Sequence, residues 1–153
     1  MQNERENFLL LEKQICFQLY SASRAMTSLY RPLLQPLDLT YPQYLVMLVL
    51  WEEDKINVKQ LGEKLLLDSG TLTPLLKKLQ AKELLTRQRS ATDERNLQIE
   101  LTAAGKKLRE KAAHVPEQLM CAMGLDPASL LQIKNLLNQL LPINQPNHEQ
   151  DTL

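Results

Sequence analysis

The sequence predicts a mainly α-helical protein with one small β-hairpin. Its composition is typical of helices, because leucine is frequent, aromatic residues make up 5% and only four glycines occur. Apolar residues also recur at helical spacing on both sides of segment 57–101. Within that segment, two short helical stretches precede two strand-like runs that are separated by a charged loop.

Segment 57–101 is the centre of the predicted organisation. Asn57 can cap a helix that runs to Lys64, and Gln60 can close the capping box. Asp68 or Ser69 can cap a second helix, whose apolar stripe comprises Leu72, Leu75, Leu76 and Leu79. Strand-like runs 84–88 and 97–101 follow. Two helices joined by a turn and followed by a charged hairpin form a winged helix-turn-helix, which is a DNA-binding arrangement.

The second helix of this segment carries the predicted DNA-reading face, formed by Ser69, Thr71, Thr73 and Lys77. Short hydroxyls and a lysine suit contacts to phosphates and thymine methyls in a major groove. Arg95, at the tip of the hairpin, is expected in a minor groove, and Asp93 is expected to hold the hairpin together. A solvated helix face remains the alternative for Lys77.

The flanking segments predict a dimer. Residues 8–36 hold a helix expected over 8–34, with an a/d stripe of Phe8, Leu11, Ile15, Leu19, Ala22, Met26, Leu29 and Leu33. Residues 103–141 hold a helix from 103 to about 122, bent at Pro116, and a last helix capped by Asp126. We expect both segments to be dimerisation helices in a single domain over 1–153, with a flexible tail at 142–153.

Several classes of function are disfavoured by the composition. Lysine plus arginine equal aspartate plus glutamate at 18 each, so only a local excess around the hairpin suggests nucleic acid. No apolar run approaches the roughly 20 residues of a membrane helix. Two cysteines 105 positions apart and two isolated histidines match no metal pattern. We therefore expect a cytoplasmic protein without a metal or a cofactor, and not an enzyme.

With these motifs in view, the chain resembles the MarR family of transcriptional regulators, and within it the organic-hydroperoxide-sensing OhrR repressors. The resemblance covers about 11–140. Its carriers are Leu11-Glu12-Lys13-Gln14-Ile15-Cys16-Phe17, Tyr20, Tyr30, Leu39-Thr40-Tyr41-Pro42-Gln43-Tyr44, the run from Leu67 to Lys77, and the hairpin residues Arg87-Gln88-Arg89-Ser90 with Asp93-Glu94-Arg95.

The resemblance implies roles for particular residues. Cys16 would be the peroxide-oxidised thiol, and Tyr20, together with Tyr30 and Tyr41 from the partner subunit, would support its thiolate. Cys121 lies where the two-cysteine class of the family has a resolving cysteine that forms an intersubunit disulfide. Arg87 and Arg89 would join Arg95 in contacting DNA. Without the resemblance, Cys16 could equally well be interpreted as a small, buried apolar side chain with no redox role.

The helical spacing is compatible with these roles. Cys16 and Tyr20 are four residues apart, so their side chains can meet on one helix face. Tyr30 lies 14 residues further on, roughly 21 Å along the axis. It can reach Cys16 only across an antiparallel pair of helices.

The predicted protein is a homodimeric repressor that binds an inverted repeat in double-stranded operator DNA and releases it when an organic hydroperoxide oxidises Cys16. Two alternatives remain at this point. One is a MarR-type repressor released by a small aromatic ligand without redox chemistry. The other is a thiol peroxidase, which no thioredoxin-like pattern supports.

Overall fold

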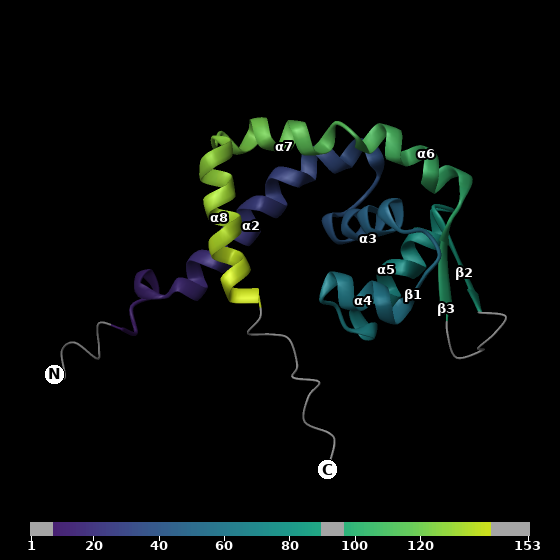
Figure 1. The fold of residues 1–153 in the computed structure, drawn as a ribbon, viewed down its shortest axis with the longest axis horizontal. Coiled ribbons are helices and arrows are strands. Elements are labelled where there is room, and N and C mark those ends of the chain that lie inside the picture. Colours follow the sequence, from purple (N-terminus) through teal and green to yellow (C-terminus); the bar gives the residue numbers. More distant parts are fainter. Residues whose placement is uncertain (1–7, 90–96, 142–153) are drawn as a thin grey trace, which may run out of the picture. The chain divides into compact units, whose positions relative to one another are not determined.

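The computed structural model describes residues 8–89 and 97–141. They fall into two compact units, one up to Leu119 and one from Met120 onward. The tail predicted at 142–153 and the hairpin tip at 90–96 lie outside the described residues. Figure 1 labels the helices and strands.

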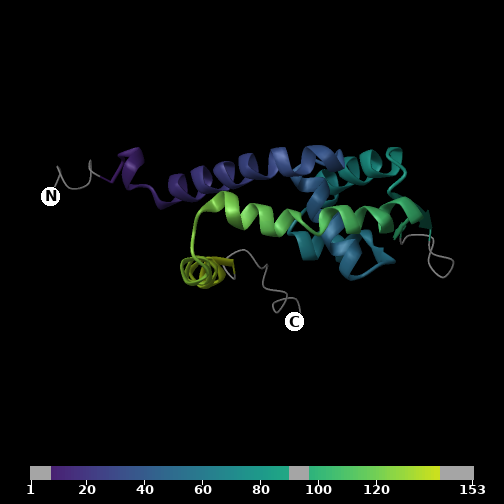
Figure 2. The same cartoon turned by 90° about the horizontal axis from the view of Figure 1, so that it is seen from above.

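The first unit begins with a 3-10 turn, η1 (Leu11–Lys13), followed by the 20-residue helix α2 (Ile15–Leu34). Gln14 separates them with an extended backbone at φ −88° and ψ 108°, and η1 is set off from the long helix in both views (Figures 1 and 2). The prediction of one helix over 8–34 was therefore wrong at its start. The apolar spacing continues through the break, so periodicity alone does not reveal it.

The middle of the first unit is the winged helix-turn-helix. A second 3-10 turn, η2 (Gln35–Leu37), leads to α3 (Tyr41–Glu52). Then come β1 (Ile56–Asn57), α4 (Val58–Leu65), α5 (Ser69–Ala81), β2 (Leu85–Arg89) and β3 (Leu97–Leu101). The predicted capping box of α4 is confirmed, because the Asn57 side chain accepts from the Gln60 N–H at 2.8 Å.

The sheet has three antiparallel strands in the order β1-β3-β2. Only the two hairpin strands were predicted. The third, β1, is two residues long and pairs Ile56 with Ile99. A pair of residues has no readable alternation, and its partner lies 43 positions away, so this strand is a product of tertiary structure.

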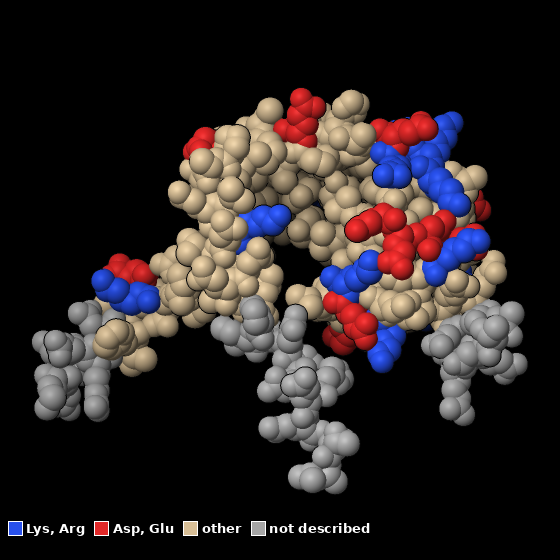
Figure 3. Space-filling view, viewed as in Figure 1, with Lys and Arg blue, Asp and Glu red and all other residues tan. Residues whose placement is uncertain are grey.

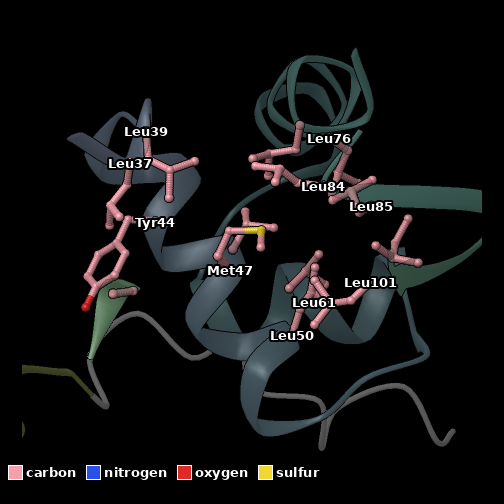
Figure 4. Close-up of a cluster of buried hydrophobic side chains, with 14 of the residues drawn as sticks. Leu37, Leu39, Tyr44, Met47, Leu50, Leu61, Leu76, Leu84, Leu85 and Leu101 are labelled. Atoms are coloured by element: carbon pink, nitrogen blue, oxygen red, sulfur yellow. The ribbon is translucent and has the colours of Figure 1, made fainter. Parts of the chain in front are cut away.

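The core of the first unit lies between α3, α4, α5 and the sheet. Figure 4 shows Met47 of α3 among leucines from all these elements. Met47, Leu61, Leu72 and Leu79 are completely buried. The run from Gln43 to Trp51 in α3 is nearly all apolar, which is typical of a helix that is enclosed on most sides. The structure agrees, because most of this run packs in the core.

The described part of the chain after the sheet holds three further helices, α6 (Ala103–Ala112), α7 (Val115–Met123) and α8 (Pro127–Leu140). One helix bent at Pro116 was predicted over 103–122. Instead, two helices form, with Pro116 in the first turn of α7, where its missing N–H costs little. The predicted Asp126 cap of α8 is confirmed, with the Asp126 Oδ1 accepting from the Ser129 N–H at 3.0 Å.

Charge is unevenly distributed over the surface. Figure 3 shows acidic and basic side chains interspersed over the part that carries the sheet and α4–α6, whereas α8 is mostly uncharged. Within the second unit, α8 has no buried residue and exposes the large apolar side chains Leu131, Ile133, Leu136, Leu137 and Leu140. An exposed apolar helix face of this kind is typical of an interaction surface.

Candidate functional site

The predicted reading face lies on α5 as expected. Leu72, Leu76 and Leu79 are buried, which leaves Ser69, Thr71 and Lys77 exposed. Thr73 is half-buried, and its hydroxyl donates to the Ser69 carbonyl at 2.7 Å. Because its hydrogen is used in this bond, the Thr73 side chain can offer a ligand only the acceptor lone pairs of its hydroxyl and its methyl group.

The start of α5 is held by Asp68. Its carboxylate accepts from the Thr71 N–H at 2.8 Å and from the Thr71 hydroxyl at 3.0 Å. These hydrogen bonds, the backbone one first, hold the pKa of Asp68 below its ordinary value. Asp68 is thus charged at neutral pH and fixes the first turn of α5.

The described part of the wing lies next to the reading helix. Arg87 of β2 donates from its Nε to the Gln80 Oε1 of α5 at 2.6 Å, so its guanidinium joins the two elements. Arg89 ends β2 opposite Leu97 of β3. The predicted tip residues, Asp93 and Arg95, lie outside the described residues.

A carboxylate that the sequence did not single out anchors the wing. Asp54, just after α3, accepts from the Leu101 N–H at 2.8 Å and forms an ion pair with Lys106 at 3.1 Å. Burial raises the pKa of Asp54, but the N–H groups of Leu101 and Lys55 and the Lys106 ammonium outweigh that effect and leave the pKa below its ordinary value. In sequence, Asp54 only ends an acidic run.

Cys16 is an exposed free thiol in the first turn of α2. The expected helix start at residue 8 hid this placement, because it put Cys16 in a helix interior. The first N–H groups of a helix lack carbonyl partners, and the helix dipole favours negative charge there. Catalytic and redox-active cysteines are often found in such environments.

Tyr20 lies one turn after Cys16 and is 57% exposed. Its phenol oxygen accepts a hydrogen bond from the Arg24 Nη1 at 2.8 Å, and the Arg24 guanidinium carbon is 5.6 Å from the centre of the Tyr20 ring. Among the described residues, no hydrogen bond reaches the Cys16 sulfur. Arg24 was not among the residues predicted from the sequence, although its i, i+4 spacing from Tyr20 is the ordinary signal of a contact on one helix face.

Tyr30 and Tyr41 lie together, as the resemblance implies. Their ring centres are 4.6 Å apart, and Tyr30 also contacts Tyr44 at 5.7 Å. Burial, with smaller contributions from Tyr41 and Tyr44, raises the pKa of Tyr30 to about 12. Its hydroxyl therefore stays protonated at neutral pH and remains a hydrogen-bond donor.

Beside this tyrosine cluster is an open cavity of about 830 Å³. Lys82, from the end of α5, lies at its wall and forms an ion pair with Asp38 at 2.9 Å. The polar lining from α2 and α3 comprises Ser23, Arg24, Thr27, Ser28, Arg31 and Tyr41. The cavity thus adjoins both the tyrosine cluster and the end of the reading helix.

Cys121 is in α7, within the second unit, and is an exposed free thiol. Within residues 8–89 and 97–141, no cluster of acidic, histidine and cysteine side chains is suited to a metal ion. None of the helices in these same ranges is both long and apolar enough to span a membrane.

Comparison with known proteins identifies the family. Residues 28–112 match the family model of the transcriptional regulators SarA/Rot. The chain belongs to this family. These regulators are MarR-like, so the predicted MarR resemblance and the winged-helix fold class are both confirmed.

Individual relatives cover nearly the whole chain. The organic hydroperoxide resistance transcriptional regulator of Bacillus subtilis is 47% identical over 141 residues, which are 92% of this chain and 95% of that protein. A structure of reduced AbfR bound to DNA has a TM-score of 0.75 at 33% identity and covers 92% of this chain and 97% of that one. AbfR comes from Staphylococcus epidermidis. Its disulfide-formed structure has a TM-score of 0.60 at 33% identity, with coverage of 94% and 95%.

Proposed function

We propose that this SarA/Rot-family protein is a homodimeric, DNA-binding repressor that leaves its operator when an organic hydroperoxide oxidises Cys16. The observation that carries the proposal is the exposed Cys16 thiol in the first turn of α2. It occurs in a chain that is 47% identical to an organic hydroperoxide resistance regulator. Because it acts on DNA, we place the protein in the cytoplasm.

The two units act together as one MarR-type domain in this proposal. Segments 8–36 and 103–141 make the dimer contacts, since η1, α2 and α8 expose large apolar side chains such as Ile15 and Leu136. Segment 57–101 reads DNA. Helix α5 enters the major groove with Ser69, Thr71, Thr73 and Lys77, and the wing follows the backbone and minor groove with Arg87, Arg89 and Arg95.

A two-fold dimer presents two reading helices to one duplex. Symmetric readers fit an inverted repeat whose half-sites are separated by about one helical turn, roughly 10 base pairs. A shift of the helices that set the distance between the two reading helices prevents both reading helices from binding their half-sites together. The affinity for the operator then falls, although each reading helix is itself unchanged.

The redox step begins with the Cys16 thiolate, which attacks the terminal peroxide oxygen. The O–O bond breaks, the substrate leaves as an alcohol after taking up a proton, and Cys16 becomes a sulfenic acid. The Tyr20 hydroxyl, and the hydroxyls of Tyr30 and Tyr41 of the partner subunit, donate hydrogen bonds that favour the thiolate. Tyr30 is suited to this role because its pKa, raised to about 12, keeps the phenol protonated as a donor even at pH 10.

The second step makes the change lasting. The Cys121 thiol of the other subunit attacks the sulfenic sulfur, an S–S bond forms and water leaves. This disulfide ties the first helix of one subunit to α7 of the other and shifts the reader spacing. Each Cys16 thiol reacts with one peroxide molecule and is then held in the disulfide. We therefore propose a stoichiometric sensor and not a peroxidase.

Operator binding by reduced protein, measured by fluorescence anisotropy before and after cumene hydroperoxide, tests the proposal. We expect affinity to fall in the wild type and to persist in Cys16→Ser. Non-reducing electrophoresis should show a dimer-sized band that needs both Cys16 and Cys121. Wild-type binding that survives peroxide, or an equal loss of binding in Cys16→Ser, contradicts the redox proposal.

The cavity supports one second candidate. Its arginines, hydroxyls and the Tyr41 ring suit a small aromatic acid, and such a ligand could act on the reader through Lys82. Release of the operator from Cys16→Ser by a phenolic acid, with no response of the wild type to peroxide, would favour this function over redox sensing.

A further inference from the structure

Arg24 is a charged residue of α2 that contacts Tyr20, which lies on the same helix face as Cys16. Its Nη1 donates to the Tyr20 phenol oxygen at 2.8 Å, and its guanidinium carbon lies 5.6 Å from the centre of that ring. Within the described residues, Arg24 forms no ion pair with a carboxylate. Its charge is therefore available to the phenol.

The hydrogen bond has a definite direction. An arginine can only donate, whereas a phenol has one donor hydrogen and acceptor lone pairs. The Arg24–Tyr20 bond occupies an acceptor site of Tyr20 and leaves the O–H free to donate elsewhere. A cationic donor also withdraws electron density from the phenol oxygen, which makes the remaining O–H a stronger donor.

The geometry of a helix sets where that free hydrogen can go. Side chains on an α-helix lean toward its N-terminus, and residues four apart lie on one face. Arg24 reaches back to Tyr20, as their hydrogen bond shows. Cys16 is four residues before Tyr20, so the same helix geometry places Tyr20 one turn after the thiol on one face of α2.

We propose that Arg24 is a positioning residue that orients and polarises the Tyr20 hydroxyl as a hydrogen-bond donor to the Cys16 thiolate. This inference rests on the proposed redox function and adds to it a residue that never touches the sulfur or the peroxide. Within residues 8–24, which the structure describes, the other charged side chains are Glu12 and Lys13 of η1, which have opposite signs. Arg24 therefore supplies the unbalanced charge of this stretch.

Among the described residues, Arg24 is the only charged side chain that is hydrogen-bonded to Tyr20. Helix α3 and turn η2 pack against α2. Their contacts include the rings of Tyr41 and Tyr44 against Tyr30. The Asp38 carboxylate after η2 is paired with Lys82.

The test measures Cys16 alone. Only two cysteines occur in the chain, so in a Cys121→Ser background the loss of free thiol on addition of cumene hydroperoxide reports the rate at Cys16. This rate is measured from pH 6 to pH 10 for Arg24→Gln, Arg24→Lys, Tyr20→Phe and the double variant Arg24→Gln/Tyr20→Phe. Arg109→Gln, which removes the same charge from the exposed face of α6, is the matched control.

We expect Arg24→Gln to slow oxidation at pH 7 by roughly five-fold, since a charge-assisted hydrogen bond is about twice as strong as a neutral one. The rate difference should vanish at high pH, where a thiol ionises without help. Arg24→Lys should recover part of the rate because it keeps the charge. Tyr20→Phe should also be slow, and adding Arg24→Gln to it should have no further effect. Arg109→Gln should match its parent.

Two results overturn the inference. One is a pH–rate profile of Arg24→Gln that coincides with its parent, and the other is an Arg24→Gln effect of equal size with and without the Tyr20 hydroxyl. Operator affinity of the reduced variants checks that they are folded. If the parent thiol itself fails to react with peroxide, the proposed function is at fault. If the parent reacts and Arg24→Gln reacts equally fast, only the role of Arg24 is refuted.

Discussion

Substituting Gly105 by alanine should destabilise the protein, although alanine is the better helix former. Gly105 is in the first turn of α6 and is buried against the end of α5 and the sheet. A Cβ placed there would lie 2.0 Å from the Leu84 carbonyl oxygen and 3.1 Å from the Leu101 Cδ2. The first of these atoms belongs to the backbone and cannot rotate away.

The size of the effect follows from competing contributions. Helix propensity favours alanine by about 1 kcal/mol. Against it, overpacking a core contact costs about 1–3 kcal/mol. Displacing the Leu84 carbonyl also breaks the hydrogen bond that it accepts from the Thr102 N–H at 3.1 Å, worth about 1 kcal/mol. The expected net loss is about 2 kcal/mol, or roughly 4–8 °C in Tm for a chain of this length.

Urea unfolding followed by tryptophan fluorescence measures this directly. The single tryptophan, Trp51, donates from its Nε1 to the Gly105 carbonyl at 2.9 Å, so it reports on the same junction. Protein concentration must be held constant if the chain is a dimer. Ala104→Gly, at the exposed neighbouring position, calibrates the propensity effect and should lose about 1 kcal/mol. A Gly105→Ala variant as stable as the wild type would refute the steric reasoning.

Three further predictions concern capping, protonation and DNA contact. Asn57→Ala should lower the free energy of unfolding by about 1 kcal/mol in urea, because the capping bond to Gln60 is lost; an unchanged midpoint would contradict it. The pKa of Tyr30, about 12, lies above the value near 10 of an unfolded tyrosine. The free energy of unfolding should therefore fall as pH rises from 10 to 12. In parallel urea titrations, the free energy of unfolding of Tyr30→Phe should fall less over that interval. Lys77→Ala should weaken operator binding and reduce the slope of log affinity against log salt by about one; an unchanged slope would exclude a phosphate contact.

Local capping was predicted from the sequence with most success. Asn57 and Asp126 were expected to start helices, and Asp68 was one of two candidates for a third; each side chain accepts an N–H two or three residues ahead. Such a bond lies within one turn, so a short stretch of sequence contains both partners. The apolar stripes of α4 and α5 were predictable for the same reason.

Contacts between distant residues were not predictable in this way. The bond from Trp51 to Gly105 spans 54 positions, and that from Leu101 to Asp54 spans 47. No periodicity or spacing rule links such partners. In the sequence, Asp54 is only the last residue of an acidic run, although it fixes the end of β3 against the segment after α3.

The sequence by itself determined the winged-helix class, the position of the helix α5 that is proposed to read DNA, and the two candidate cysteines, because periodic patterns and short motifs encode them. Only the tertiary structure decided that α2 begins after Gln14, so that Cys16 lies in a helix start, and that Arg24 bonds to Tyr20. Apolar spacing continues through Gln14 unbroken, and side-chain direction depends on the folded backbone. The residues of the proposed sensor were thus visible in the sequence, whereas their local electrostatic environment was not.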